Sequence, residues 1–256
     1  MRILHIAAGA GAMYCGACAR DIALVRGLRA RGHDVSVVPL YTPVRIDGDE
    51  PFPIAPVFLG GINLYLQQRS AFFRRLPKTI DRILDSSSLL RFVSKFAINT
   101  KASELGDMTV SVLAGGNGPL RKESDYLLDY LEKQDKPEII VITNTMLSGL
   151  APEFKKRLDV PIICQVQGED AFVGGMPDPH RIQAEELIRE NARFVDLFVS
   201  PNEAYAETMR GYLGVPEDKL RVVRTGFDAQ AFDPEPTGAD QPFTIGYLSV
   251  ITGVKG

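Results

Sequence analysis

Residues 7–21, AAGAGAMYCGACARD, carry two kinds of group that could do chemistry: a pair of thiols and a run of glycines. Cys15 and Cys18 form a Cys-x-x-Cys pair, which is typical of thiol oxidoreductases and of half a zinc site. A structural zinc ion needs about four ligands, and the one other cysteine, Cys164, lies in an apolar run. We therefore expect no metal here, and interpret Cys18 as an apolar-face helix residue and Cys15 as a loop residue. Thiol oxidoreductase chemistry is the weaker alternative.

The glycines of the same segment favour a loop that receives an anion. Backbone N–H groups approach a phosphate closely where side chains are absent, and a following helix presents its positive N-terminus to it. A dinucleotide fingerprint is not formed, because Tyr14 occupies the third glycine position and no acidic residue ends the next apolar run. A dinucleotide-dependent dehydrogenase is therefore not favoured. The glycines of the expected loop are Gly9, Gly11 and Gly16.

Polar residues follow two later apolar runs, where the strands of an α/β sheet would present ligand-binding loops. Asn144 comes directly after one run, and the second is followed by Gln167, Gly168, Glu169 and Asp170. Gln167 and Asp170 are the candidates for contact with reacting groups, although no catalytic residue is assigned. Helix capping is the alternative for Glu169 and Asp170 and the favoured role for Asn144. Inside the first apolar run, His5 is interpreted as a core residue with satisfied hydrogen bonds, in preference to a catalyst.

The elements that must position these residues alternate between strands and helices. Segments with helical spacing of apolar residues lie at 18–33, 124–135, 148–159, 181–195 and 202–214. Continuous apolar strands joined by helices are typical of a parallel sheet covered on both faces. The sequence therefore predicts an α/β, Rossmann-like, doubly wound parallel sheet. The apolar runs of strand length cover 2–8, 34–41, 56–66, 138–143, 161–167, 197–201, 220–226 and 243–251.

The same pattern predicts how the chain divides into domains. One Rossmann-like domain spans 1–235, a Pro- and Gly-containing linker spans 236–242, and 243–256 holds a last strand. A single strand with a short turn cannot bury a core of its own. We therefore expect 243–256 to be the first strand of a second domain that is truncated here.

Composition excludes some partners and locations. The chain has 256 residues, of which 45% are hydrophobic, and a net charge of -3, so we expect no nucleic-acid partner. The N-terminal apolar run is too short for a signal peptide, and no run of about 18 apolar residues occurs, which predicts a cytoplasmic protein. Segment 64–98 carries seven Lys or Arg against two Asp, with aromatic residues interleaved. That pattern fits peripheral contact with an anionic membrane or, as we favour, an inward-packing helical insertion.

Several segments, in order, resemble the glycogen-synthase-like (family 4, "group 1") glycosyltransferases. MRILHIAAGAG followed by LVRGLRARGHDVSVV resembles the family's opening strand, glycine-rich loop, helix and turn into strand two. The blocks KPEIIVITNTMLSGLA, DVPIICQVQGED and DLFVSPNEAYAETMRGYLGVPEDKLRVVRTGFDAQAFDP resemble later parts of the same half. FTIGYLSVITGVKG resembles the first strand and Lys-Gly turn of the C-terminal, donor-binding domain.

The resemblance implies a GT-B architecture, of which this chain is the N-terminal, acceptor-side half. It also implies that the glycine loop faces the donor phosphates and the transferred sugar. The family's His-Gly falls at Gln167 and Gly168, so that glutamine replaces histidine, and the Asn-Gly of the hinge block keeps its glycine as Gly226. One of the two cations on the donor diphosphate is kept as Lys255, whereas the other position holds Val250.

The implied activity is transfer of a sugar, with retention of configuration, from a nucleotide sugar to a sugar or lipid-linked acceptor. No metal and no other cofactor is expected. Because most donor contacts would come from the absent domain, we expect the isolated chain to bind nucleotide sugars weakly and to transfer no sugar. A non-catalytic sugar- or nucleotide-binding protein on the same fold is the second interpretation, ahead of a thiol oxidoreductase that uses Cys15 and Cys18.

Overall fold

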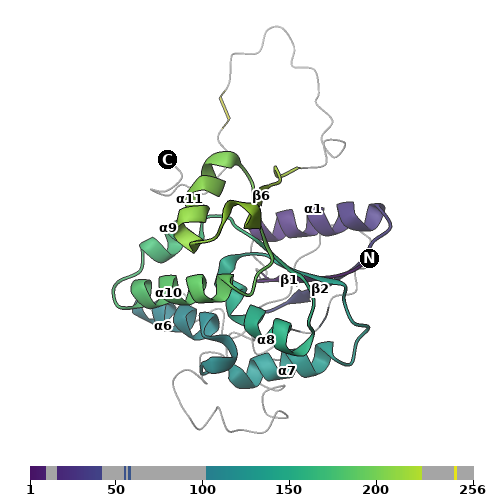
Figure 1. Cartoon of the computed structure of the whole chain (residues 1–256), viewed down its shortest axis with the longest axis horizontal. Coiled ribbons are helices and arrows are strands. Elements are labelled where there is room, and N and C mark those ends of the chain that lie inside the picture. The colour runs from purple at the N-terminus through teal and green to yellow at the C-terminus, as the bar shows by residue number, and fades with distance from the viewer. Residues whose placement is uncertain (10–15, 42–54, 56, 59–101, 227–244, 247–256) are drawn as a thin grey trace. The chain divides into compact units, whose positions relative to one another are not determined.

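The computed structural model describes residues 1–9, 16–41, 55, 57–58, 102–226 and 245–246, with the backbone alone for 102–105. The chain divides into two compact units, Met1–Gly226 and Phe227–Gly256. The first unit contains the described helices and strands (Figure 1).

Six parallel strands form one sheet in the order β2-β1-β3-β4-β5-β6. Each strand lies within a predicted apolar run, so the doubly wound parallel sheet is confirmed. Of the remaining predicted runs, 56–66 and 243–251 lie almost wholly outside the described residues, and the described residues within them are not in strands. The strands are β1 (Arg2–Ala7), β2 (Asp34–Pro39), β3 (Ile139–Ile142), β4 (Ile162–Gln165), β5 (Leu197–Ser200) and β6 (Leu220–Val222).

Helices connect the strands, and those of the described part begin and end as follows. The α-helices are α1 (Gly16–Ala30), α6 (Ala102–Leu113), α7 (Arg121–Leu131), α8 (Ala151–Arg157), α9 (Glu169–Gly174), α10 (His180–Ala192) and α11 (Glu203–Leu213). Short 3-10 helices lie at η2 (Gly115–Asn117), η3 (Thr145–Leu150) and η4 (Glu217–Lys219). The sequence did not predict α6 and α9, and part of the helix predicted at 148–159 is the 3-10 helix η3.

Two layers of apolar side chains hold the helices on the sheet. On one face, Ile22 and Val25 of α1 pack with Ile3, Val37 and Val141. The burial of Cys18, Ile22 and Val25 confirms the predicted apolar face of α1. The opposite face carries a larger core, and Figure 1 shows α7, α8 and α10 on the side of the sheet away from α1. Large side chains of that core include Leu127, Ile140, Phe154 and Phe198.

An asparagine cap and a terminal glycine define the two ends of α11, the helix that carries Tyr205. The Asn202 side chain accepts a hydrogen bond from the Tyr205 N–H at 2.8 Å, which caps the N-terminus. Gly214 ends the helix with φ +65, a left-handed conformation that costs glycine little. The helix therefore begins shortly after the carboxyl end of β5 and ends at Leu213.

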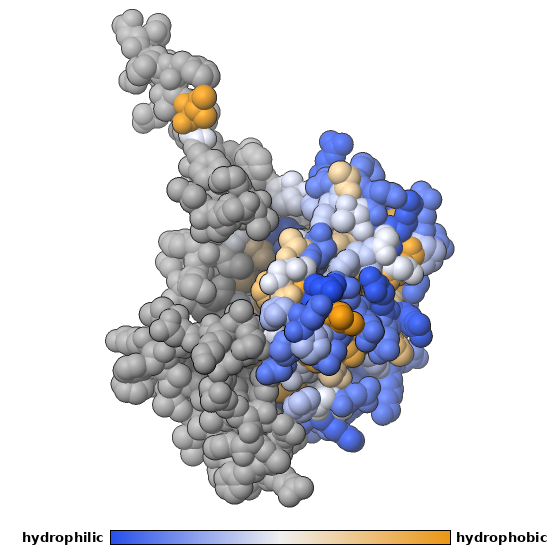
Figure 2. Space-filling model, turned by 90° about the vertical axis from the view of Figure 1, so that its left-hand side faces the viewer, coloured by the Kyte–Doolittle hydropathy of each residue, from blue (hydrophilic) through white to orange (hydrophobic). Residues whose placement is uncertain are grey.

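The described surface is mainly polar. Figure 2 shows one side of the molecule, on which the described atoms are mostly hydrophilic with small, separate hydrophobic areas. Within the described part of the chain, the large apolar side chains with substantial exposure are Met1, Leu24, Phe172, Ile182, Phe194, Val223 and Ile245. No helix of the described part is both long and apolar enough to cross a bilayer.

Candidate functional site at the carboxyl end of the sheet

The strand order reverses between β1 and β3, because β2 continues the sheet on one side and β3 to β6 on the other. Doubly wound sheets bind ligands beyond the carboxyl ends of their strands at such a reversal. Ile6 pairs with Ile142 and Ile142 with Cys164, so β1, β3 and β4 end at the same level. We call the loops after these three strands the switch-point site.

The glycine loop after β1 is described only at its two ends. Gly9 has φ +80, a conformation that disfavours other residues. Gly16 begins α1, is exposed, and has open space where a Cβ would lie. Gly11 and Cys15 lie outside the described residues. The phosphate-facing role of this loop stays a prediction, and its two described ends leave the backbone accessible.

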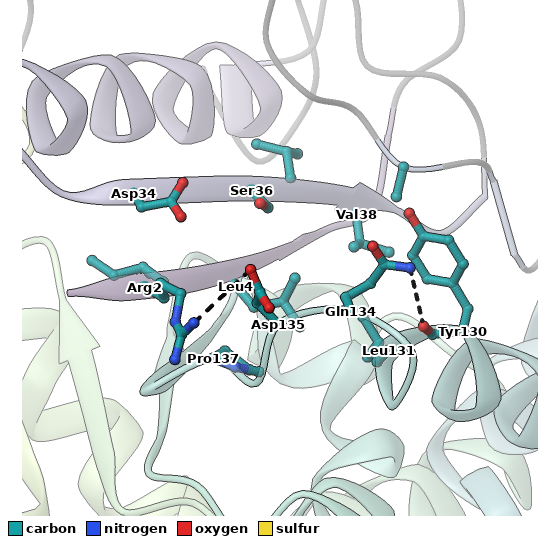
Figure 3. Close-up of a pocket in the computed structure, with 13 residues that line it drawn as sticks. Arg2, Leu4, Asp34, Ser36, Val38, Tyr130, Leu131, Gln134, Asp135 and Pro137 are labelled. Atoms are coloured by element: carbon teal, nitrogen blue, oxygen red, sulfur yellow. Dashed lines mark hydrogen bonds and ion pairs between the residues drawn. The ribbon is translucent and has the colours of Figure 1, made fainter.

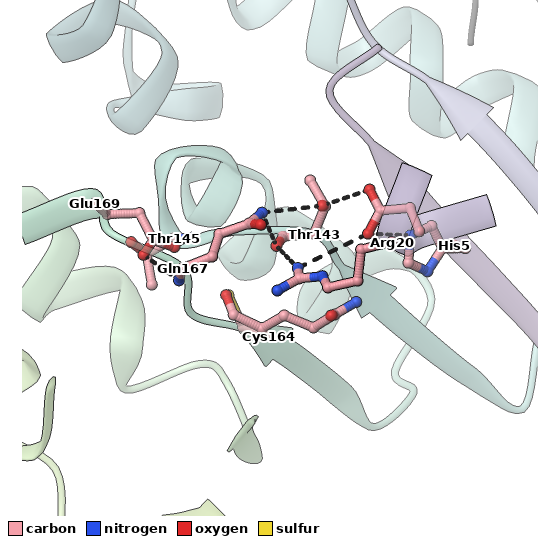
Figure 4. Close-up of polar contacts among 9 residues, drawn as sticks. His5, Arg20, Thr143, Thr145, Cys164, Gln167 and Glu169 are labelled. Carbon is pink, nitrogen blue, oxygen red and sulfur yellow. Dashed lines mark hydrogen bonds and ion pairs between the residues drawn. The ribbon is translucent and has the colours of Figure 1, made fainter. Parts of the chain in front are cut away.

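Gln167 is fixed at the switch-point site by the end of β3 (Figure 4). Its Nε2 donates to the Thr143 carbonyl oxygen at 2.9 Å and lies 3.4 Å from the Thr143 hydroxyl. Arg20 donates to the same carbonyl at 3.2 Å. The hydroxyl of Thr143 donates to Asp21 Oδ2 at 2.6 Å, which ties α1 to β3. Since the amide nitrogen faces Thr143, the amide oxygen of Gln167 is presented on the other side as an acceptor.

His5 and Asp21 form a buried pair beneath this network. Each side chain is almost fully buried, and His5 Nε2 lies 3.3 Å from Asp21 Oδ1. The burial of His5 within β1 confirms its interpretation as a core residue. The expectation that its polar groups are satisfied is wrong for the described part of the chain, where neither ring nitrogen makes a hydrogen bond. The sequence did not predict its partner, which is 16 residues away on the first turns of α1.

Glu169 joins the loops after β3 and β4. Its Oε1 accepts from the Thr145 N–H at 2.9 Å, and its Oε2 accepts from the Gln167 N–H at 2.6 Å. The residue is only 4% exposed. Both carboxylate oxygens are used inside the protein, which favours a role in positioning Gln167 over direct contact with a ligand.

Tyr205 of α11 is a site residue that sequence reasoning missed. Its hydroxyl accepts from the Gly168 N–H, donates to Asp170 Oδ1 at 2.8 Å and lies 3.2 Å from Glu169 Oε2. Burial, followed by the charge of Glu169, raises the pKa of this hydroxyl, so it stays a donor. Gly168 has φ +103, which lets the chain turn there. The tyrosine lies three residues after a capping asparagine, and that signal indicates a helix start rather than a site.

The predicted capping roles are not formed. Asn144 occupies the N-cap position of η3, yet its side chain makes no capping bond, and its Oδ1 is buried without a hydrogen-bond partner in the described part of the chain. The N-cap of α9 is Gly168, so Glu169 and Asp170 lie in the first turn and bond to tertiary partners instead. Capping was the wrong expectation for Asn144. For Glu169 and Asp170, where capping was the alternative, the carboxylates accept hydrogen bonds from other parts of the fold instead. Ligand contacts at these positions stay predictions.

The remaining predicted residues either follow another strand or lie outside the described residues. Gly226 follows β6, at the far edge of the sheet from β2, and is exposed. Lys255, Val250 and the basic segment 64–98 lie outside the described residues. The described residues contain no group of three or more His, Cys, Asp or Glu that could hold a metal ion.

The cysteines of the described part are buried. Cys18 faces the core from α1, and Cys164 lies in β4. Burial, reinforced by the charge of Glu169, raises the pKa of the Cys164 thiol well above the ordinary 9.0. A raised pKa keeps this sulfur protonated and unreactive near neutral pH.

A cavity of about 250 Å³ lies at the other end of the sheet (Figure 3). It opens beside the first half of β1, most of the length of β2 and the last turn of α7, and at one end Arg2 lies 4.0 Å from Asp135. Ligands of doubly wound sheets bind at the carboxyl ends, so we do not include this cavity in the candidate site. Its polar lining includes Arg2, Asp34, Ser36, Tyr130, Gln134 and Asp135.

Comparisons with known proteins identify similar solved structures and a matching family model. The chain is similar to Anabaena Alr3699/HepE, solved in complex with UDP-glucose, at 12% identity and a TM-score of 0.47 over 92% of this chain and 47% of that one. It is similar to Arabidopsis thaliana UGT89C1 complexed with UDP-L-rhamnose, at 13% identity and a TM-score of 0.42 over 92% and 55%. The chain thus spans about half the length of these proteins. Among curated proteins there is no match.

A family model described as "Glycosyl transferase 4-like domain" matches residues 22–226, from the second turn of α1 to just past β6. This match covers most of the chain and confirms the resemblance drawn from its sequence blocks. The chain therefore belongs to the glycosyl transferase 4-like domain family.

Proposed function

We propose that the chain is the acceptor-side half of a GT-B glycosyltransferase, which transfers a sugar from a nucleotide sugar to a carbohydrate or lipid-linked acceptor. The observation that carries this proposal is the family match over residues 22–226, whose sheet holds Gln167 at the strand reversal where ligands bind. In the proposed layout, residues 1–235 form the acceptor-side domain, 236–242 form a linker, and 243–256 begin the donor-binding domain.

The proposed mechanism depends on position and hydrogen bonding. The glycine loop offers backbone N–H groups to the donor, and Gln167 offers its amide oxygen to a sugar hydroxyl. A glutamine does not change charge near neutral pH, so it orients the hydroxyl and does not act as a base. Catalysis in this proposal comes from alignment of donor and acceptor and from stabilisation of the leaving diphosphate, with no metal or other cofactor.

The proposal also covers where the protein acts and what kind of acceptor it uses. We place the protein in the cytoplasm, in carbohydrate biosynthesis. A peripheral contact of segment 64–98 with an anionic membrane would suit a lipid-linked acceptor, since the segment carries an excess of basic residues. Sedimentation with vesicles containing anionic lipid tests that contact, and equal sedimentation with neutral vesicles would argue against it.

A panel of UDP-, GDP- and ADP-sugars tests the main proposal. Backbone contacts contribute roughly 1 kcal/mol each, whereas a micromolar site requires about 8 kcal/mol. Calorimetric titration of the 256-residue chain should therefore show millimolar binding at best and no sugar transfer. The longest product of the same reading frame should bind the donor with micromolar affinity and transfer its sugar. In that product, Gly11→Val should reduce turnover by crowding the loop.

Three results would contradict this proposal. Micromolar donor affinity in the 256-residue chain would show that the donor site lies in this domain and not in the second one. Donor binding by the longest product without transfer to any acceptor would favour the non-catalytic interpretation. Insulin reduction that is abolished by Cys15→Ser would favour the thiol oxidoreductase.

A further inference from the structure

Arg20 is a cation with unused donors at the switch-point site. Its side chain is 16% exposed, and its Nη2 donates to the Thr143 carbonyl at 3.2 Å. Its Nε is buried and has no hydrogen-bond partner in the described part of the chain. A guanidinium carries five N–H groups in a fixed fork. Part of this fork is therefore left without an acceptor among the described residues.

Gln165 supplies a second unused donor on the same face of the sheet. It is 7% exposed, and its Nε2 has no hydrogen-bond partner among the described residues. Because Ile142 pairs with Cys164, Thr143 and Gln165 are the next residues along these two strands. Side chains alternate along a strand, and Val141 and Ile163 pack in the cluster beneath α1. Thr143, Gln165 and Arg20 thus meet at one edge of the sheet.

The neighbouring acids face other groups of the protein, although Asp21 Oδ1 makes no hydrogen bond within the described residues. Asp21 Oδ1 lies 3.9 Å from Arg20 Nη2, a longer separation than the 3.3 Å to His5 Nε2, and Asp21 Oδ2 accepts from Thr143. The carboxylate of Glu169 accepts two backbone N–H groups. The N-terminus of α1, which is 15 residues long, adds positive potential close to Arg20. A group that only accepts hydrogen bonds and carries negative charge fits these donors.

We propose that Arg20 and Gln165 bind the diphosphate of the nucleotide sugar, with Arg20 as the charged contact contributed by the acceptor-side domain. The identity of the anion rests on the proposed function, whereas the anion site itself rests on the two donors. A planar guanidinium pairs with two phosphate oxygens at once. Thr143 holds Arg20 by its carbonyl and therefore orients the fork toward the ligand.

Inorganic pyrophosphate, titrated into the 256-residue chain and followed by nitrogen-15 NMR, tests the anion site without any sugar chemistry. We expect saturable shifts at the backbone of Gly16–Asp21 and at the Gln165 side-chain amide. Arg20→Gln should weaken binding at least tenfold, and Arg20→Lys should weaken it less. The matched control is Arg31→Gln, an exposed position just after α1 that loses the same charge and should keep the affinity within twofold.

Gln165→Leu is a second variant that keeps the fold, because it replaces a buried donor that bonds nothing in the described structure. We expect it to weaken pyrophosphate binding severalfold with no loss of thermal stability. Unchanged affinity in both Arg20→Gln and Gln165→Leu would overturn the inference. Should Arg20→Gln fail to fold, wild-type shifts confined to residues away from Gly16–Asp21 and Gln165 would overturn it.

The same measurements separate this inference from the proposed function. Pyrophosphate binding that depends on Arg20 supports the anion site even if the longest product of the reading frame transfers no sugar, in which case the proposed function alone fails. Sugar transfer that proceeds equally well in Arg20→Gln would overturn the inference and leave the proposed function standing.

Discussion

Replacing Glu169 by alanine should destabilise the chain far more than an ordinary surface substitution. The carboxylate accepts from the Thr145 N–H at 2.9 Å and from the Gln167 N–H at 2.6 Å, and Tyr205 lies within 3.2 Å. Alanine removes all three acceptor contacts. Thr145 is 1% exposed, so water cannot replace the lost partner of its N–H. The loops after β3 and β4 would lose the bonds that connect them.

The size of the effect follows from the number of donors left without a partner. A buried donor that loses its partner costs about 1–3 kcal/mol, and more where the partner was charged. Two such N–H groups, one of them partly reached by water, give about 2–5 kcal/mol of destabilisation for Glu169→Ala. Glu169→Gln keeps one acceptor oxygen but turns its NH₂ group toward the other N–H, which should cost about 1–3 kcal/mol.

Urea unfolding followed by circular dichroism measures this difference. With a slope of about 2 kcal/mol per molar urea, Glu169→Ala should lower the midpoint by about 1–2.5 M. The control is Glu186→Gln, an exposed carboxylate on α10, which should change stability by less than about 0.5 kcal/mol. A loss below about 1 kcal/mol in Glu169→Ala would refute the positioning role of this carboxylate.

Three further predictions concern single residues of the core and the site. Thr143→Val removes the hydroxyl that donates to buried Asp21 and should cost about 1–3 kcal/mol in urea unfolding, whereas Thr143→Ser should recover most of it. Iodoacetamide at pH 8 should leave Cys164 unmodified until urea unfolds the chain, as mass spectrometry would show. Because the folded pKa of this thiol lies above the ordinary 9.0, the free energy of unfolding should also fall above pH 9.0 by more in wild type than in Cys164→Ala. Gly149→Ala should lower the free energy of unfolding by about 1–3 kcal/mol or more, because its Cβ would lie 2.2 Å from a backbone carbonyl oxygen of α6. The control is Gly211→Ala inside α11, which has open space around its Cβ and should stabilise the chain by about 0.5–1 kcal/mol. Thermal melts measure both effects.

The amino-acid sequence by itself determined the class of the fold and the family. A buried parallel strand is a continuous apolar run and a surface helix repeats every three to four residues, so both are encoded within short windows. Hence β1 to β6 and the buried face of α1 were predictable from local pattern. Helix α9, only six residues long, was not, because so short an element shows no complete apolar repeat.

Tertiary structure alone decided which polar groups meet at the candidate site. Asp21 and Thr143 are 122 positions apart, and Tyr205 reaches Asp170 from 35 positions away. Local pattern favoured helix capping for Asn144 and left it as an alternative for Asp170, yet neither side chain caps a helix. A hydrogen bond depends on the distance between two groups in space, and the strand order that brings β1, β3 and β4 together sets those distances. Because no periodicity of the chain records that order, the partners of these residues could be found only in the folded protein.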